Sequence, residues 1–149
     1  MPSPSFSSTG AASGVLGIGV DLVENERMRA VLDRWGAHFK SRVFLPAEQC
    51  YCEACGRPWQ HYAGRFAVKE AVSKALGTGI GQPVGWLDIE VVRGASGAPA
   101  VQLHGGARKL ACRRGAGRVL VSLAHTRNYA VAQAVLLGGR RRHHKGVTS

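Results

Sequence analysis

The sequence predicts an α+β domain in which helices cover a mainly antiparallel sheet. Two apolar segments near the C-terminus, 118–124 and 129–137, have the character of strands and are joined by the short connection HTRN, as in a hairpin. A long alanine-rich segment at 60–76 carries a broad apolar stripe and no proline, as a packed helix does. The predicted order of elements is β-α-α-α-β-β-α-β-β.

The N-terminal half is expected to form one strand followed by three helices. Residues 15–20 alternate aliphatic residues with glycine, which suits a buried strand. Apolar residues recur at helical spacing over 22–35, and Gly36 is expected to end that helix. A short helix at 46–53 has a proline in its first turn, and a loop is expected at 56–59 before the long helix.

The second half is expected to be richer in strands. Three glycines stop the long helix, and the hydrophobic period changes to that of a strand over 86–93. A turn with the sequence SGAP then leads into a second strand at 100–103. A short helix at 106–113 precedes the C-terminal hairpin.

The length and composition of the chain suit one globular domain. Its 149 residues are enough to bury a core, and no apolar run approaches the roughly 20 residues that cross a bilayer. We expect a leader at 1–14, a domain at 15–138 and a basic tail at 139–149. Because the leader lacks basic residues and a long apolar block, it does not look like a secretory signal, and the expected location is the cytoplasm.

The charge balance favours an anionic partner. The chain has 20 Lys and Arg against 9 Asp and Glu, a net charge of +11 with His neutral. Four of these cations belong to the C-terminal run RRRHHK, and subtracting them leaves about +7 on the rest. Nucleic acid, a phosphorylated small molecule or an acidic protein would all suit this charge. A nucleic-acid-binding module is the alternative function, although aromatic residues are not interleaved with the basic ones.

Three of the four cysteines lie close together in the segment CYCEAC. A zinc site would use the pair Cys52 and Cys55, completed by Cys112 or His61. The remaining ligands do not follow zinc-finger spacing, so reduced structural thiols are the simpler interpretation.

Asp21 lies where the first strand is expected to give way to a helix. Asp is a favoured N-cap residue, and Asp21 followed by Glu24 imitates a capping box. A carboxylate at the end of a strand also suits a divalent cation. Both roles remain open from the local sequence.

Glu70 and Lys74 lie four residues apart on the long helix. This spacing is that of an ordinary surface ion pair. However, the helix has little polar surface, and a carboxylate beside an ammonium also suits a metal ion and a phosphorylated ligand. The glycine-rich loop at 77–85 resembles neither a P-loop nor a dinucleotide fingerprint, so it is read first as a helix stop. His125, at the end of a strand, is structural or functional.

Together these segments resemble the holo-acyl-carrier-protein synthase family, the small 4′-phosphopantetheinyl transferases of bacterial fatty-acid synthesis. The resemblance runs from about Leu16 to Leu137. It rests on three motifs in order: GIGVDLVENERM, GRFAVKEAVSKALGTGIG and VSLAHTRNYAVAQAV. The segment CYCEAC and the tail RRRHHK are not part of the family pattern.

The resemblance implies an enzyme that binds coenzyme A with Mg²⁺. It would move the phosphopantetheine arm to a serine of apo acyl carrier protein and leave adenosine 3′,5′-bisphosphate. By match, Asp21 and Glu70 would be the metal ligands, and Lys74 would contact the phosphates. The residues implied to hold the coenzyme are Arg65, Lys74, Gly77, His125 and Thr126. The proton acceptor for the serine would be Glu70 itself or a metal-bound water.

The resemblance also implies the partners. The helix after Asp21 would dock the acidic carrier protein through Arg27, Arg29 and Arg34, in agreement with the basic charge of the chain. The expected assembly is a homotrimer with coenzyme sites at its subunit interfaces, and no membrane partner is expected.

Overall fold

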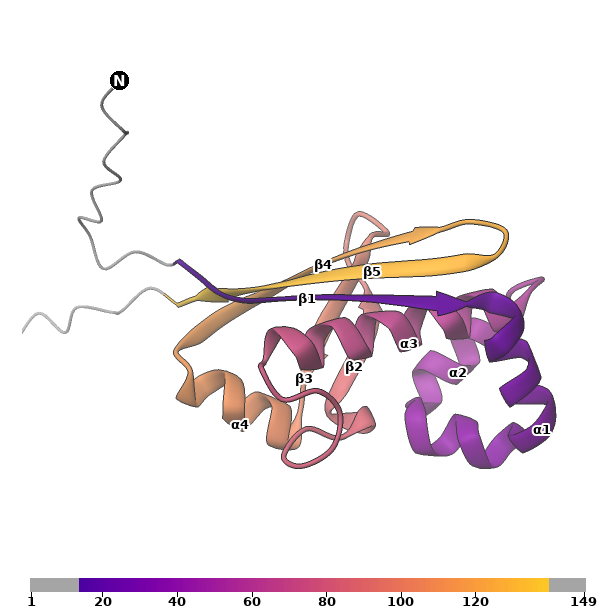
Figure 1. Cartoon of the computed structure of the whole chain (residues 1–149), viewed down its shortest axis with the longest axis horizontal. Helices are drawn as coiled ribbons and strands as arrows, with labels where there is room; N and C mark the ends of the chain where they lie inside the picture. Colours follow the sequence, from indigo (N-terminus) through magenta and orange to yellow (C-terminus); the bar gives the residue numbers. More distant parts are fainter. Residues whose placement is uncertain (1–13, 140–149) are drawn as a thin grey trace, which may run out of the picture.

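The larger of two antiparallel sheets has the C-terminal strand at its centre (Figure 1). In this computed structural model, which describes residues 14–139, β1 (Val15–Glu24) and β4 (Ala116–His125) both pair with β5 (Tyr129–Gly138). Strands β4 and β5 form the predicted hairpin. The α+β fold with an antiparallel sheet is therefore confirmed.

Four helices pack on one side of this sheet. Helix α3 (Pro58–Ala75) runs along the sheet, as Figure 1 shows, and it packs against all three strands. Helices α1 (Asn25–Val43) and α2 (Pro46–Glu53) lie near one end of α3, and α4 (Gly105–Arg113) lies near the other. Helix α3 begins at a proline two residues earlier than expected, because a proline at the first helical position needs no hydrogen-bonded N–H.

The smaller sheet pairs β2 (Ile89–Arg93) with β3 (Pro99–Leu103). The strand predicted over 86–93 is correct only from Ile89 onwards. Its first three residues form the 3₁₀-helix η1 (Trp86–Asp88), and the carboxylate of Asp88 accepts a hydrogen bond from the backbone N–H of Gly85 at 2.9 Å. This contact satisfies a backbone donor at the start of η1.

Strand β1 continues four residues beyond the predicted end of the strand. Its register with β5 runs without a shift from Gly17 to Glu24, and Val23 is buried while Leu22 is exposed. The helix expected from residue 22 therefore begins only at Asn25, because pairing with β5 outweighs the local helical spacing. Asp21 lies within the strand, so the capping interpretation of Asp21 was wrong.

Helix α1 is two helical segments joined by a kink. Gly36 has φ +47° and ψ −128°, a conformation that favours glycine, and helical structure resumes after it as far as Val43. The expected helix stop is therefore confirmed as a break in the helix, whereas the second segment was not predicted.

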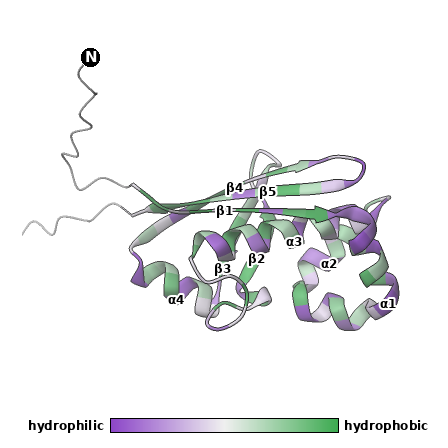
Figure 2. Cartoon of the chain, in the orientation of Figure 1, coloured by the Kyte–Doolittle hydropathy of each residue, from purple (hydrophilic) through white to green (hydrophobic). Residues whose placement is uncertain are grey.

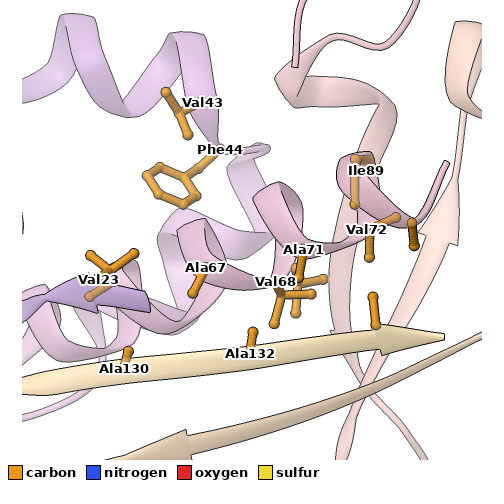
Figure 3. Close-up of a cluster of buried hydrophobic side chains, with 14 of the residues drawn as sticks. Val23, Val43, Phe44, Ala67, Val68, Ala71, Val72, Ile89, Ala130 and Ala132 are labelled. Carbon is orange, nitrogen blue, oxygen red and sulfur yellow. The ribbon is translucent and has the colours of Figure 1, made fainter. Parts of the chain in front are cut away.

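The core lies between α3 and the larger sheet. Ala67 and Ala71 face the small side chains Ala130 and Ala132 of β5 (Figure 3), and all four are buried. Small residues on both elements allow the helix to lie close to the strands. This close approach fixes the position of α3 relative to the end of β1.

The opposite face of the larger sheet is apolar but exposed. Figure 2 shows hydrophobic residues along β1 and β5, although the helices of the described part of the chain lie on the other side. The exposed apolar side chains on this outer face are Ile18, Val20, Leu22, Leu120 and Val131. An exposed sheet face that carries several large apolar side chains is typical of a contact surface.

The predicted leader at 1–14 and the predicted tail at 139–149 lie outside the described residues, except for Gly14 and Gly139. Within residues 14–139, none of the helices combines the length and the apolar character that spanning a bilayer requires.

Candidate active site

A cavity of about 410 Å³ opens where the end of β1 meets α1 and α3. Asp21 and Glu24 of β1, Arg27 of α1, and Phe66 and Glu70 of α3 all line it. Two segments far apart in the sequence thus bring the carboxylates of Asp21 and Glu70 to one hollow. Sequence reasoning assigned Glu24 only to a capping box and missed its place at this cavity.

Lys74 is paired with Asp21, and this pair forms one side of the site. Its Nζ donates to Oδ1 of Asp21 at 3.1 Å and to the backbone carbonyl of Val20 at 3.0 Å. Among the ion pairs of the described residues, none joins Lys74 to Glu70. The interpretation of Glu70 and Lys74 as a surface ion pair is therefore wrong, and Lys74 instead connects α3 to β1.

The two carboxylates suit a divalent cation. Burial raises the pKa of Glu70, and the negative charge of Asp21 raises it further, whereas Lys74 lowers it. Crowded, partly buried carboxylates become more stable when a cation lies between them. Mg²⁺ takes one or two carboxylates and completes its shell with phosphate oxygens and waters, so the donor set of Asp21 and Glu70 fits.

Two further predicted residues, Arg65 and His125, line a second cavity of about 250 Å³. The position of the His125 ring depends on Gly64 of α3. A Cβ built on Gly64 would lie 2.7 Å from Cε1 of His125, so only glycine leaves room for the ring in this position. Arg65 is buried, whereas His125 is exposed.

The two cavities lie on opposite flanks of α3. Asp21 belongs to β1 and His125 to β4, and β5 lies between these strands. Two strand spacings separate β1 from β4 by about 10 Å. None of the described residues lines both cavities. One copy of the chain therefore does not bring Arg65 and His125 to the carboxylates.

Thr126 and Gly77 form hydrogen bonds that close local turns. The backbone N–H of Thr126 donates to the carbonyl of Tyr129 at 2.8 Å, and its Oγ1 accepts from the N–H of Tyr129 at 2.9 Å. The N–H of Gly77 donates to the carbonyl of Lys74, and the next two amides donate to Ser73. The loop after α3 is thus a helix stop, as the sequence predicts. A coenzyme contact of Gly77 or Thr126 stays a prediction.

The three arginines predicted for carrier docking differ in their surroundings. Arg27 is exposed and lines the cavity of Asp21 and Glu70. The guanidinium of Arg29 lies 4.6 Å from the ring centroid of Trp59, and that of Arg34 lies 4.9 Å from the ring centroid of Trp35. Of the three, Arg27 is therefore nearest to the proposed chemistry.

Lys69 is a buried residue with a structural network of its own. Its Nζ donates to Oε2 of Glu48 at 2.8 Å and to the carbonyls of Trp86 and Ile89 at 3.0 and 2.6 Å. Both charged side chains are almost fully buried. Nothing in the spacing of the sequence indicated that Glu48 and Lys69 would meet.

The cysteines do not form the zinc site that was considered. Cys52 is buried in the core, and burial raises the pKa of its thiol to about 12. The thiol of Cys55 donates to the carbonyl of Tyr51. Within residues 14–139, no group of three or more His, Cys, Asp or Glu side chains is placed to hold a metal ion.

Comparison with known proteins agrees with this architecture. Residues 17–134 match the model of the 4′-phosphopantetheinyl transferase superfamily. The holo-[acyl-carrier-protein] synthase of Desulforudis audaxviator is 47% identical over 124 residues, which cover 83% of this chain and 94% of that protein.

Solved structures give the same result. The holo-[acyl-carrier-protein] synthase of Neisseria meningitidis superposes with a TM-score of 0.77 at 31% identity, over 83% of this chain and 98% of that one. The enzyme of Helicobacter pylori, described in complex with coenzyme A, gives 0.71 at 30% identity over 80% and 98%. With its fold, its three motifs and these relatives in agreement, the chain belongs to the 4′-phosphopantetheinyl transferase superfamily.

Proposed function

We propose that this chain transfers the 4′-phosphopantetheine arm of coenzyme A to a serine of an apo acyl carrier protein. The serine oxygen forms a bond to phosphorus, the diphosphate bond breaks, and adenosine 3′,5′-bisphosphate leaves. The observation that carries the proposal is the meeting of Asp21 and Glu70 at one cavity, in a chain whose relatives are holo-acyl-carrier-protein synthases.

Asp21 and Glu70 would hold Mg²⁺, which when bound neutralises charge on the diphosphate oxygens. Lys74, which lies against Asp21, would neutralise charge on the leaving bisphosphate. Glu70 is also a candidate to accept the serine proton, since its carboxylate faces the cavity. In these roles the three side chains would position the diphosphate and neutralise its charge. Positioning and charge neutralisation account for most of the catalysis of phosphoryl transfer.

The coenzyme would lie across the boundary between two copies of the chain. Arg65 and His125 are suited to its phosphates, but they lie on the flank of α3 that faces away from Glu70. A homotrimer that uses the exposed outer face of the larger sheet would bring the two flanks of different copies together. The apolar side chains on that face support this assembly.

The carrier protein would dock on α1. Acyl carrier proteins are acidic, and Arg27, Arg29 and Arg34 give α1 positive charge, with Arg27 at the cavity itself. Fatty-acid synthesis and a cytoplasmic location stay predictions from the sequence. The nucleic-acid alternative rests on net charge alone, and no feature of the described residues favours it.

Incubation with coenzyme A, Mg²⁺ and an apo carrier protein tests the activity. We expect the carrier to gain the mass of phosphopantetheine, and we expect EDTA to abolish the gain. Mass spectrometry of the carrier is the measurement. Several apo carriers that all stay unmodified would contradict the proposal.

Glu70→Gln tests the role of the carboxylate. We expect turnover to fall by about a hundredfold or more, because the amide keeps the shape but removes a negative ligand. Glu26→Gln is the matched control, since the Glu26 side chain is 77% exposed on α1. Thermal unfolding of both variants checks the fold. Near-normal turnover of Glu70→Gln would show that Glu70 is not a metal ligand.

A further inference from the structure

The cavity that contains Arg65 and His125 is built entirely from uncharged and basic residues. Four elements supply its polar side chains: Tyr51 from α2, His61 and Arg65 from α3, Arg93 from β2 and His125 from β4. Among residues 14–139, no carboxylate lines it. A hollow with two guanidinium groups, two imidazoles and no acid has a positive potential that selects an anion.

Arg65 lacks a full set of partners in this cavity. The residue is only 7% exposed, and its buried Nε has no hydrogen-bond partner within residues 14–139. Its guanidinium lies 3.9 Å from the ring centroid of Tyr51, and that of Arg93 lies 5.7 Å from the same ring. A buried cation with an unsatisfied donor is stabilised when an oxyanion binds beside it.

His61 lines this cavity but lies outside the three family motifs. Its ring centroid lies 5.7 Å from that of Tyr51 and 6.2 Å from that of His125. The charged groups that face it are Arg65 on its own helix and Arg93 on β2. Burial lowers the pKa of His61, and the nearby His125 and Arg65 lower it further. At neutral pH the free protein therefore holds His61 mainly in its neutral form.

Burial and Arg65 lower the pKa of His125 as well. An anion in the cavity would raise the pKa of both histidines, because a negative charge within a few ångströms favours the imidazolium form. Two imidazolium rings beside two guanidinium groups would repel one another. The pair of His61 and His125 is therefore expected to take up one proton rather than two.

We propose that His61 is a further ligand-binding residue of this enzyme, and that the pair of His61 and His125 takes up one proton when a phosphomonoester dianion enters the cavity. Coenzyme A supplies such a group on its ribose, in addition to its diphosphate. The inference rests on the proposed transferase function, since it assigns the phosphomonoester of that substrate to a proton-accepting pair. It predicts selection for coenzyme A over its dephospho form, and selection that weakens as the pH rises.

Calorimetric titration of the full chain with coenzyme A and with dephospho-coenzyme A at pH 7.0 and 8.5 tests the inference. The free phosphomonoester has a pKa near 6, so it is a dianion across this range and its own titration does not interfere. His61→Asn keeps a hydrogen-bonding side chain but cannot be protonated. His38→Asn is the matched control, because His38 is exposed on α1 and does not line the cavity.

We expect His61→Asn to bind coenzyme A about tenfold more weakly than the parent chain at pH 7.0 and about equally at pH 8.5. Binding of dephospho-coenzyme A should change little, and the His38→Asn variant should match the parent chain throughout. Titrations at pH 7.0 in two buffers of different ionisation enthalpy should show proton uptake in the parent chain and less in His61→Asn.

Unchanged pH dependence in His61→Asn would overturn the inference, and so would an equal loss of affinity for both ligands. Failure of the transferase proposal is recognised separately. If no carrier gains mass in the transfer assay, that function is wrong. If carriers are modified but His61→Asn behaves like the parent chain, only the inference about His61 is wrong.

Discussion

At the scale of single residues, the most buried charges belong to the framework rather than to the chemistry. The carboxylate of Glu48 accepts a hydrogen bond from the ammonium of Lys69. It also accepts hydrogen bonds from the backbone N–H groups of Leu45, at 2.8 Å, and Val91, at 2.9 Å. Burial lowers the pKa of Lys69, and the charge of Glu48 opposes this effect. The pair thereby links α2, α3 and β2 next to the helix turn that carries Glu70.

Lys69→Met should lower the free energy of unfolding by about 3–5 kcal/mol, because it leaves the Glu48 carboxylate buried without its cation. Lys40→Met is the matched control. Lys40 pairs with Glu53, whose side chain is 48% exposed, so its removal should cost about 1 kcal/mol or less. Urea denaturation measures both variants. Equal decreases in the free energy of unfolding for the two variants would show that the buried ion pair stabilises the fold no more than the exposed one.

At the scale of elements, the contact between β1 and α3 holds the two carboxylates together. A Cβ built on Gly19 would lie 1.9 Å from the carbonyl oxygen of Ala71, and one built on Gly17 would lie 2.0 Å from that of Ala75. These are backbone atoms of a packed helix, so they cannot rotate away. The glycines of the GIGVD segment therefore let the strand lie directly on the helix.

Gly19→Ala should lower the free energy of unfolding by about 3 kcal/mol, because the added methyl group must push α3 away from β1. It should also weaken activity, since the same shift separates Asp21 from Glu70. Gly56→Ala is the matched control, because open space surrounds Gly56 and the change should stay within about 0.5 kcal/mol. Thermal or urea unfolding gives the comparison, and a Gly19→Ala variant as stable as the control would refute the close contact.

The hydrophobic period of the sequence was enough to predict most elements. Helix α3 and the β4–β5 hairpin appear close to their expected positions, since their patterns agree with their burial. The helix expected from residue 22 failed because its first residues pair with β5, and this partner lies more than a hundred positions away. Local spacing does not contain that information.

The candidate site shows the same limit. The motifs pointed to Asp21, Glu70 and Lys74, and the structure brings these three together. It does not bring Arg65 or His125 to them, because the two cavities lie on opposite flanks of α3 and β5 separates the strands of Asp21 and His125. The buried partners of Lys69 were also beyond prediction, because they come from α2, η1 and β2, which meet α3 only after folding.

At the scale of the whole molecule, the separation of the two groups predicts that subunits share a site. Mixing Glu70→Gln and Arg65→Gln chains by co-refolding should restore about a quarter of the parent activity, because a random trimer forms some sites from two intact halves. The transfer assay measures the recovery.

Mixing Glu70→Gln with Lys74→Gln is the matched control for this experiment. Glu70 and Lys74 belong to the same half of the site, so every mixed site stays defective and no recovery is expected. Similar recovery in both mixtures, or none in the first, would contradict a site shared between subunits.

The position of helix α3 between the two cavities has a consequence for how the enzyme is assayed. In the proposed trimer, a solitary chain would carry one half of each of two different reaction centres and would complete neither. Specific activity should therefore fall steeply on dilution, since each turnover requires that neighbours have first met. Lowering the enzyme concentration below the dissociation constant of the assembly should abolish the activity, although every chain stays folded and chemically intact.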